Sequence, residues 1–194
     1  MRNITKPTTA QCNLAIYTLF LLYEPKYISC VRLPQILGNL SPDSVNRFLW
    51  RENYTPKDLF DEVAPQIELE GGTISTEYLV IDKPYSHPAK AELIDYFYSG
   101  KHKKVVKAIN VVTLYYTDGK GRSVTVNYRI VNKQEGQTKH EYFLEMLDEV
   151  KAWGLKPETV TGDSWYAAKE TMNTLKDKGF RGLFAPHVNR ARLG

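Results

Sequence analysis

The 194-residue chain is poor in cysteine and has no long apolar run. Cys12 and Cys30, its two cysteines, form neither a metal-ligand spacing nor a disulfide framework, so we expect a reducing compartment, the cytoplasm. The longest apolar run, residues 14–22, falls short of the roughly 20 residues that a membrane-spanning helix needs. No small-residue cleavage pattern follows this run. We therefore expect a buried helix there, and no membrane partner.

The composition also lacks a strong charge imbalance. The formal net charge is +4, which permits a polyanionic partner without requiring one. Hydrophobic residues make up 42% and charged residues 25%, which are ordinary values for a globular protein. We find no internal repeat and no low-complexity tract. The length is sufficient for one domain of ordinary size with an extension.

Residues 1–70 have the pattern of a helical region punctuated by proline. Two helix starts are predicted at Ser41-Pro42 and Thr55-Pro56, where a hydroxyl N-cap precedes a proline in the first helical turn. A pair of short helices fits either a DNA-reading helix-turn-helix or a plain packed helical hairpin. In the first case, Arg47, Arg51 and Lys57 are the expected contacts to DNA phosphates.

Residues 71–194 have a different pattern, which begins at the glycine pair Gly71-Gly72. Alternating β-branched and aromatic residues predict strands, and three- and four-residue apolar spacing predicts helices. The predicted strands are 73–81, 105–117, 123–131, 159–161 and 182–187, and the predicted helices are 138–153 and 166–178. The β-β-β-α-β-α-β order indicates an α/β fold, in which an antiparallel meander is extended by parallel strands through right-handed crossovers.

Acidic residues lie where two of these strands could become neighbours. Asp163 follows the strand 159–161, whereas Glu77 lies in the middle of the first strand and Asp82 at its end. Carboxylates on adjacent strands repel each other unless a divalent cation lies between them, and Mg²⁺ or Mn²⁺ prefers oxygen ligands. Such a site can activate water or a DNA 3′-hydroxyl for attack on a phosphodiester. A simpler role for Asp163, capping the following helix, remains open.

A basic segment precedes the strand 105–117. It contains Lys101, Lys103, Lys104 and Lys107, which form either a solvated loop or a contact to DNA phosphates. The chain also has 13 tyrosines, which we expect mostly in strands and in the core rather than as platforms for stacking bases.

Several of these segments together resemble a known family. The motifs "VIDKPYS", "SGKHKKVVKAIN" and "GDSWY" occur in the order found in the DDE transposases of bacterial insertion sequences, and the resemblance runs from about residue 41 to 194. It implies a ribonuclease H-like fold, a magnesium or manganese site, and cutting and joining of DNA at transposon ends. A protein of this kind is expected in the bacterial cytoplasm with the nucleoid. The resemblance leaves a homodimer open.

The resemblance also assigns residues. Asp163 of "GDSWY" falls on the second catalytic aspartate, and the first normally lies in an Asp-Asp-Thr/Ser motif, where this chain has Glu77-Tyr78-Leu79. We therefore expect Asp163 and Glu77, with Asp82 close by, as the catalytic and metal-binding acids. The third acid is expected on a helix beyond the last strand, which the sequence does not reach by Gly194. These departures predict a truncated amino-terminal portion, inactive or poorly active. The alternatives are a non-catalytic DNA-binding remnant and a metal-dependent nuclease of the same fold.

Overall fold

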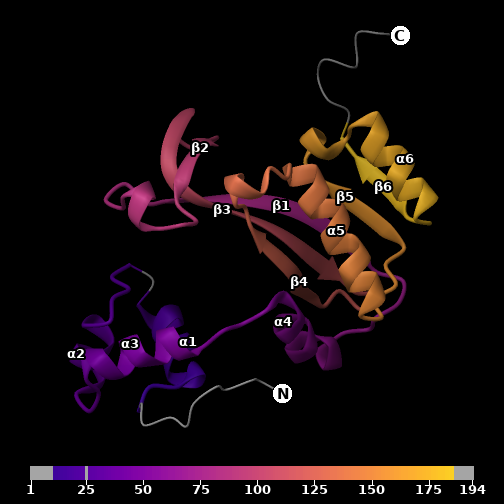
Figure 1. The fold of residues 1–194 in the computed structure, drawn as a ribbon. Helices are drawn as coiled ribbons and strands as arrows, with labels where there is room; N and C mark the ends of the chain where they lie inside the picture. Colours follow the sequence, from indigo (N-terminus) through magenta and orange to yellow (C-terminus); the bar gives the residue numbers. More distant parts are fainter. Residues whose placement is uncertain (1–10, 25, 186–194) are drawn as a thin grey trace. The chain divides into compact units, whose positions relative to one another are not determined.

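The computed structural model describes residues 11–24 and 26–185, which form two compact units divided between Thr55 and Pro56 (Figure 1). The division precedes the predicted boundary at Gly71-Gly72. Helix α4 (Pro56–Val63) accounts for the difference, because it packs on a strand of the second unit and places Phe60 in that unit's core.

The first unit contains three helices: α1 (Leu14–Tyr23), α2 (Arg32–Leu37) and α3 (Pro42–Arg51). Its small core is formed by five side chains, Cys12, Phe20, Leu33, Val45 and Phe48. The N-cap predicted at Ser41 is confirmed, since its side chain accepts the N–H of Ser44. The second predicted helix start is also correct, but α3 and α4 belong to different compact units rather than to one helical pair.

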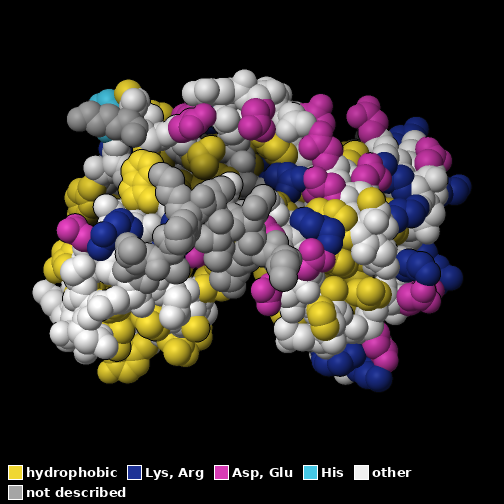
Figure 2. Space-filling model, turned by 60° about the horizontal axis from the view of Figure 1, so that its bottom comes forward, with side chains coloured by type: hydrophobic (Ala, Val, Ile, Leu, Met, Phe, Trp, Pro, Cys, Tyr) yellow, Lys and Arg dark blue, Asp and Glu magenta, His cyan; other side chains and the backbone are white. Residues whose placement is uncertain are grey.

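The apolar run 14–22 forms α1, but the prediction that this helix is buried is wrong for the described residues. Only Phe20 is buried within it, whereas Leu19, Leu22 and Tyr23 are 65%, 75% and 79% exposed. Apolar side chains that reach the surface are visible in the space-filling view (Figure 2). Among the residues that the structure describes, no helix combines the length and the apolar character needed to cross a bilayer.

The second unit is built on one sheet. Its strands are β1 (Thr73–Asp82), β2 (Asp95–Ser99), β3 (Lys104–Thr117), β4 (Ser123–Ile130), β5 (Thr159–Gly162) and β6 (Arg181–Phe184). Strand β3 pairs antiparallel with β1 on one side and with β4 on the other, while β5 is parallel to β1 and β6 is parallel to β5. This order, β4-β3-β1-β5-β6, is the predicted ribonuclease H-like arrangement.

Two details of the sheet differ from the prediction. Strand β2 was not predicted; it pairs with the first residues of β3 and forms a hairpin arm (Figure 1). The last strand is β6, Arg181–Phe184, and the end of the predicted strand 182–187 lies outside the described residues.

Helices α5 (Lys139–Ala152) and α6 (Lys169–Asp177) pack on one face of this sheet. The apolar stripe of α5 is fully buried, and its members are Tyr142, Phe143, Met146, Leu147 and Val150. Opposite it, alternate residues of β1 and β3, such as Ile74 and Leu114, are buried as well. Burying each large apolar side chain contributes roughly 1.5–3 kcal/mol. This packing fixes the strands whose ends carry the acidic residues.

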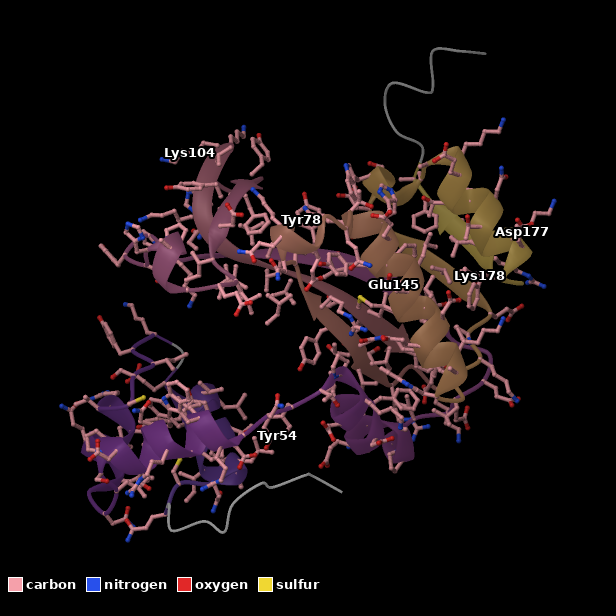
Figure 3. All side chains as sticks on the ribbon, in the orientation of Figure 1. Tyr54, Tyr78, Lys104, Glu145, Asp177 and Lys178 are labelled. Atoms are coloured by element: carbon pink, nitrogen blue, oxygen red, sulfur yellow. The ribbon has the colours of Figure 1, made fainter. Side chains whose placement is uncertain are left out.

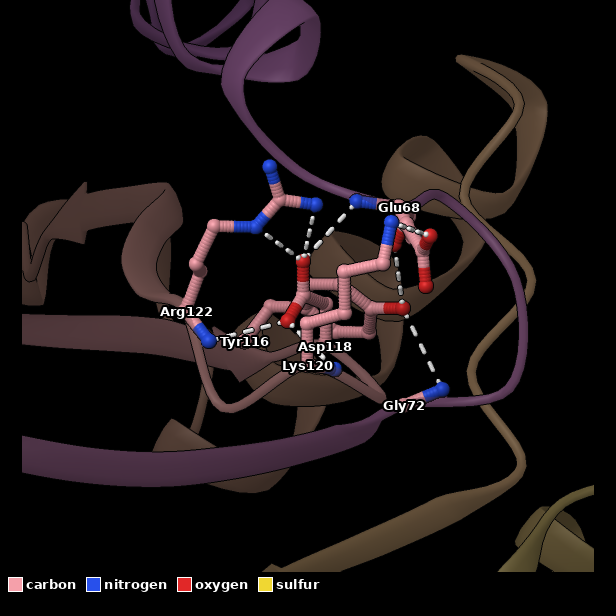
Figure 4. Close-up of polar contacts among 6 residues, drawn as sticks. All are labelled: Glu68, Gly72, Tyr116, Asp118, Lys120 and Arg122. Carbon is pink, nitrogen blue, oxygen red and sulfur yellow. Dashed lines mark hydrogen bonds and ion pairs between the residues drawn. The ribbon is translucent and has the colours of Figure 1, made fainter.

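A polar network ties the segment before β1 to the end of β3 (Figure 4). The Asp118 carboxylate accepts the backbone N–H groups of Glu68, Lys120 and Arg122 and pairs with the Arg122 guanidinium. The buried hydroxyl of Tyr116 donates to the Glu68 carbonyl and accepts the Gly72 N–H. Burial by itself would raise the pKa of Asp118, but these hydrogen bonds lower it to about 2.

Candidate active site

Glu77 and Asp163 are neighbours at the carboxyl end of β5. The parallel pairing of β1 and β5 ends with Thr76 opposite Gly162, so the next residues along the two strands are Glu77 and Asp163. Both side chains are exposed, and both residues line one cleft of about 650 Å³. The prediction that the strand before Asp163 lies beside the first strand is confirmed. The two carboxylates therefore share one cleft.

Asp163 also has a local role. Its Oδ1 accepts the Trp165 N–H at 3.4 Å and the Ser164 hydroxyl at 3.1 Å, which caps the 3-10 helix Ser164–Tyr166. Asp163 thus caps this short 3-10 helix rather than the predicted helix 166–178, which begins as α6 at Lys169 with Ala168 at its N-cap. Within the described part of the chain, no cation forms an ion pair with Asp163 or Glu77. Lys101 is the cation that lines the cleft with the two acids in the described part of the chain.

The carboxylates of Asp163 and Glu77 both contribute to the raised pKa of Tyr166. Its side chain is fully buried, and burial raises the pKa of Tyr166 to about 12, with further upward contributions from Tyr78, Asp163 and Glu77. The neighbouring Thr76 hydroxyl lowers this pKa, although the two hydroxyls are not aligned as a hydrogen bond and neither has another partner among the described residues. Burial is thus the main cause of the raised pKa of Tyr166, and the two carboxylates add to it.

Side chains in the first turn of α5 pack against the segment that contains Asp163. The His140 ring stacks on Trp165 at 4.2 Å between centroids, and the Lys139 ammonium lies 3.6 Å from the centre of the Tyr78 ring. Burial lowers the pKa of both Lys139 and His140, and a hydrogen bond to the Trp165 backbone partly opposes this for His140. Figure 3 labels Tyr78 on β1, close to the start of α5. These contacts position the turn on which the Asp163 carboxylate depends.

Asp82 lies apart from this pair. It is five residues beyond Glu77 on β1, a separation of roughly 16 Å along an extended strand, and it does not line the cleft. Its Oδ2 is 2.6 Å from Nε2 of His102. The structure therefore brings together Asp163 and Glu77 and does not bring Asp82 to them. Local spacing alone left the choice between Glu77 and Asp82 open.

The predicted basic segment is the turn of the β2–β3 hairpin. Ser99, Gly100 and Lys101 complete the lining of the cleft, while Lys103 and Lys104 are exposed nearby (Figure 3 labels Lys104). Lys103 has φ 50°, a left-handed conformation that favours glycine.

Sequence reasoning missed β2 and hence the hairpin. The alternation in "DYFYS" directly before Gly100 was the available signal. Lys107 lies further along β3, and its ammonium donates to the Ser86 carbonyl at 3.1 Å. Of the four predicted lysines, Lys101 is thus the one that lines the cleft with the acids.

The predicted arginines lie in the other unit. Arg47 is exposed on α3, where its Nε donates to the Asp43 carbonyl. The Arg51 side chain is only 12% exposed, pairs with Glu52 and lies over the Phe48 ring, so its charge is largely engaged within its own unit. A DNA contact by either residue stays a prediction.

The side chains at the cleft carry the type of donor atom, oxygen, that a hard divalent cation prefers. Glu77 and Asp163 offer carboxylate oxygens, and Mg²⁺ is commonly held by one or two carboxylates together with water and substrate phosphate. Among the described residues, no group of three or more His, Cys, Asp or Glu side chains could hold a metal ion. Two protein ligands predict weak binding that a phosphate in the cleft would strengthen.

Comparisons with known proteins find similarity to solved structures. No protein-family model matches the chain, and no curated protein matches it. A chain in the intasome of simian T-cell lymphotropic virus with the PP2A regulatory subunit B56 gamma is 11% identical with a TM-score of 0.36, and the match covers 91% of this chain and 53% of that chain. A chain in the Mos1 strand transfer complex is 13% identical with a TM-score of 0.33, and the match covers 96% of this chain and 61% of that chain. A chain in the Drosophila P element transposase strand transfer complex is 11% identical with a TM-score of 0.41, and the match covers 92% of this chain and 38% of that chain.

This chain thus spans between 38% and 61% of the length of those proteins. At these identities and TM-scores we draw no conclusion about function from the similarity. The ribonuclease H-like assignment rests on the strand order and register described above.

Proposed function

We propose that the second unit is a transposase-type phosphodiester-processing domain that uses Mg²⁺ or Mn²⁺ and acts on DNA. The observation that carries this proposal is the placement of Glu77 and Asp163 side by side in one cleft that Lys101 also lines. Two carboxylates in one cleft offer the oxygen ligands that Mg²⁺ prefers, and the hairpin lysine supplies a charge that suits a phosphate. The ribonuclease H-like strand order supports the same reading.

Each residue then has a role that follows from its chemistry. Glu77 and Asp163 would hold the metal ion, and Lys101 would bind a non-bridging phosphate oxygen. The metal, when bound, lowers the pKa of a water or DNA hydroxyl and polarises the phosphorus centre. His140 and Trp165 act through Asp163 as positioning residues, because they hold its turn. Glu77 has one methylene more than aspartate, and misplacement of about 1 Å can cost on the order of 10²-fold in rate.

The motifs support a finer proposal. The order of "VIDKPYS", "SGKHKKVVKAIN" and "GDSWY" favours the DDE transposases of bacterial insertion sequences, with transposon-end DNA as the partner in the bacterial cytoplasm. Asp163 and Glu77 take the places of the first two acids. With two ligands in the described part, we expect slow chemistry from this polypeptide.

Metal binding is the first test of the proposal. Isothermal titration of the full chain with Mn²⁺ should show binding that Asp163→Asn and Glu77→Gln each weaken by at least about 10-fold, because each removes one carboxylate. Asp82→Asn is the matched control, since Asp82 lies outside the cleft. Equal binding by wild type and both cleft variants would refute the metal site.

A second candidate is a DNA-binding domain without catalysis, which the small number of acidic ligands favours. The third is a metal-dependent nuclease of the same fold.

Incubation with Mn²⁺ and labelled transposon-end DNA distinguishes the three candidate functions. Joined product indicates a transposase, and nicked product alone indicates a nuclease. Binding without any product indicates the non-catalytic domain. Loss of product in Asp163→Ala would assign the chemistry to this cleft.

A further inference from the structure

The β2–β3 hairpin arm has one anchored face and one open face. Phe97 and Ser99 are buried on the first face, as is Ala108. Because paired residues of antiparallel strands point to the same side, the register Tyr96↔Lys107 and Tyr98↔Val105 places these four residues on the other face. The anchored face fixes the arm on the core. The open face therefore has no packing role that would explain its aromatic residues.

Tyr96 and Tyr98 dominate the open face. They are 53% and 60% exposed, and neither ring packs on another ring or on a cation among the described residues. The tyrosines were expected mostly in strands and in the core. Tyr116 and Tyr166 are buried, whereas Tyr96 and Tyr98 lie in a strand and are exposed. Other exposed tyrosines are Tyr23, Tyr27, Tyr85 and Tyr115. Tyr96 and Tyr98 differ from these in lying two residues apart on one face, directly before the turn residues that line the cleft.

The turn that follows Tyr98 carries positive charge. Lys101, Lys103 and Lys104 are exposed there and form no ion pair within the described part of the chain, although the pairing of Lys104 with Ser99 puts Lys104 on the anchored face. Asp95 at the start of β2 pairs with Lys133, and Asp82 pairs with His102 of the turn, whereas Glu77 and Asp163 line the cleft together with Lys101. The surface therefore suits a polyanion that also has flat aromatic groups, which is the chemistry of a nucleic acid strand with unpaired bases.

We propose that Tyr96 and Tyr98 stack on two successive unpaired nucleotides of a DNA strand that continues past Lys101 into the cleft. Residues two apart on a strand are separated by roughly 6.6 Å on one face, and paired aromatics on a sheet surface stack successive bases in single-strand-binding modules. We call Tyr96 and Tyr98 the stacking platform. The turn residues Ser99–Lys101 follow it directly in the chain and line the cleft, so they connect the platform to the cleft. The inference deepens the proposed function, on which it rests: the preferred substrate is DNA with an opened end rather than an intact duplex.

Fluorescence anisotropy of the full chain tests this, with a dye-labelled oligothymidine of about 12 nucleotides and a blunt duplex of the same length at low salt. Wild type should bind the single strand more tightly than the duplex. Tyr96→Leu with Tyr98→Leu should weaken single-strand binding by about 100-fold, since stacking by each tyrosine contributes on the order of 10-fold. Tyr96→Phe with Tyr98→Phe keeps both rings and should retain most of the affinity.

Tyr27→Leu is the matched control, because Tyr27 is 64% exposed and lies in the other unit. Single-strand affinity that stays within about 2-fold in the double leucine variant, or a loss that is equal for both DNA forms, would overturn the platform. Mn²⁺ titration of the same variants separates the two proposals. If the double leucine variant binds Mn²⁺ as wild type does but has lost single-strand binding, the result supports the platform. If wild type binds no Mn²⁺, the proposed function is refuted, whereas single-strand binding that depends on the two tyrosines would still support the platform.

Discussion

Asp118 and Asp163 each follow a strand of the same sheet, yet their surroundings differ in kind. The Asp118 carboxylate is buried and accepts hydrogen bonds from three backbone N–H groups and from Arg122. The Asp163 carboxylate is exposed in a cleft beside Glu77, and one of its oxygens makes a single local cap. A carboxylate whose acceptor sites are filled by its own chain stabilises the fold. One with open sites beside another acid is available to a ligand.

The largest expected effect concerns the backbone that the Asp118 network holds. In Gly72→Ala, the new Cβ would lie 2.3 Å from the Thr117 carbonyl oxygen and 2.5 Å from the Tyr116 ring. We expect the free energy of unfolding to fall by about 2 to 3 kcal/mol in urea denaturation, because the neighbouring groups cannot move without breaking hydrogen bonds. Gly119→Ala is the control, since the nearest atom to its Cβ is 3.8 Å away. Similar losses in both variants would contradict this account.

Next in size is the effect of pH through Asp118. Its pKa falls from an ordinary 3.8 to about 2 in the folded chain, so its stabilisation is present above about pH 4 and is lost as the pH falls through about 2. Asp118→Asn should lower the urea midpoint at pH 7 and flatten the dependence of stability on pH between about 4 and 2. An unchanged slope in that window would mean that other carboxylates dominate acid unfolding.

A smaller effect, of opposite sign, is expected at the hairpin turn. Lys103→Gly relieves the left-handed conformation at φ 50° and should stabilise the second unit by about 1 kcal/mol, as judged by thermal unfolding. The same change removes one exposed cation, so affinity for DNA should fall slightly and its salt dependence should become shallower. Destabilisation by Lys103→Gly would show that the side chain contributes to the fold.

The smallest effect on stability is expected at Asp163. Asn caps helices as well as Asp does and carries no charge, so Asp163→Asn should change the free energy of unfolding without metal by less than about 0.5 kcal/mol. The contrast with Asp118→Asn is the sharpest test of the two roles. A large loss of stability in metal-free Asp163→Asn would make Asp163 a structural carboxylate as well.

Much of the second unit could be predicted because its signals are local. Alternation identified β1, β3 and β4, and the three- and four-residue spacing identified α5, whose cap Thr138 accepts the Glu141 N–H as part of a capping box. Strand β2 was missed although "DYFYS" alternates, because an alternation over five residues is a short signal. The burial of α1 was predicted wrongly, since an apolar composition does not tell how many neighbours surround a helix.

The sequence by itself determined the longer strands and helices of the second unit, their order and the motif that contains Asp163, because propensity, alternation and capping act over a few residues. Only the tertiary structure decided which acid accompanies it: the register of β1 on β5 brings Glu77 into the cleft and leaves Asp82 with His102. It also decided which tyrosines are buried and which face solvent on the hairpin. These outcomes depend on pairing between segments distant in the chain, which no local pattern specifies.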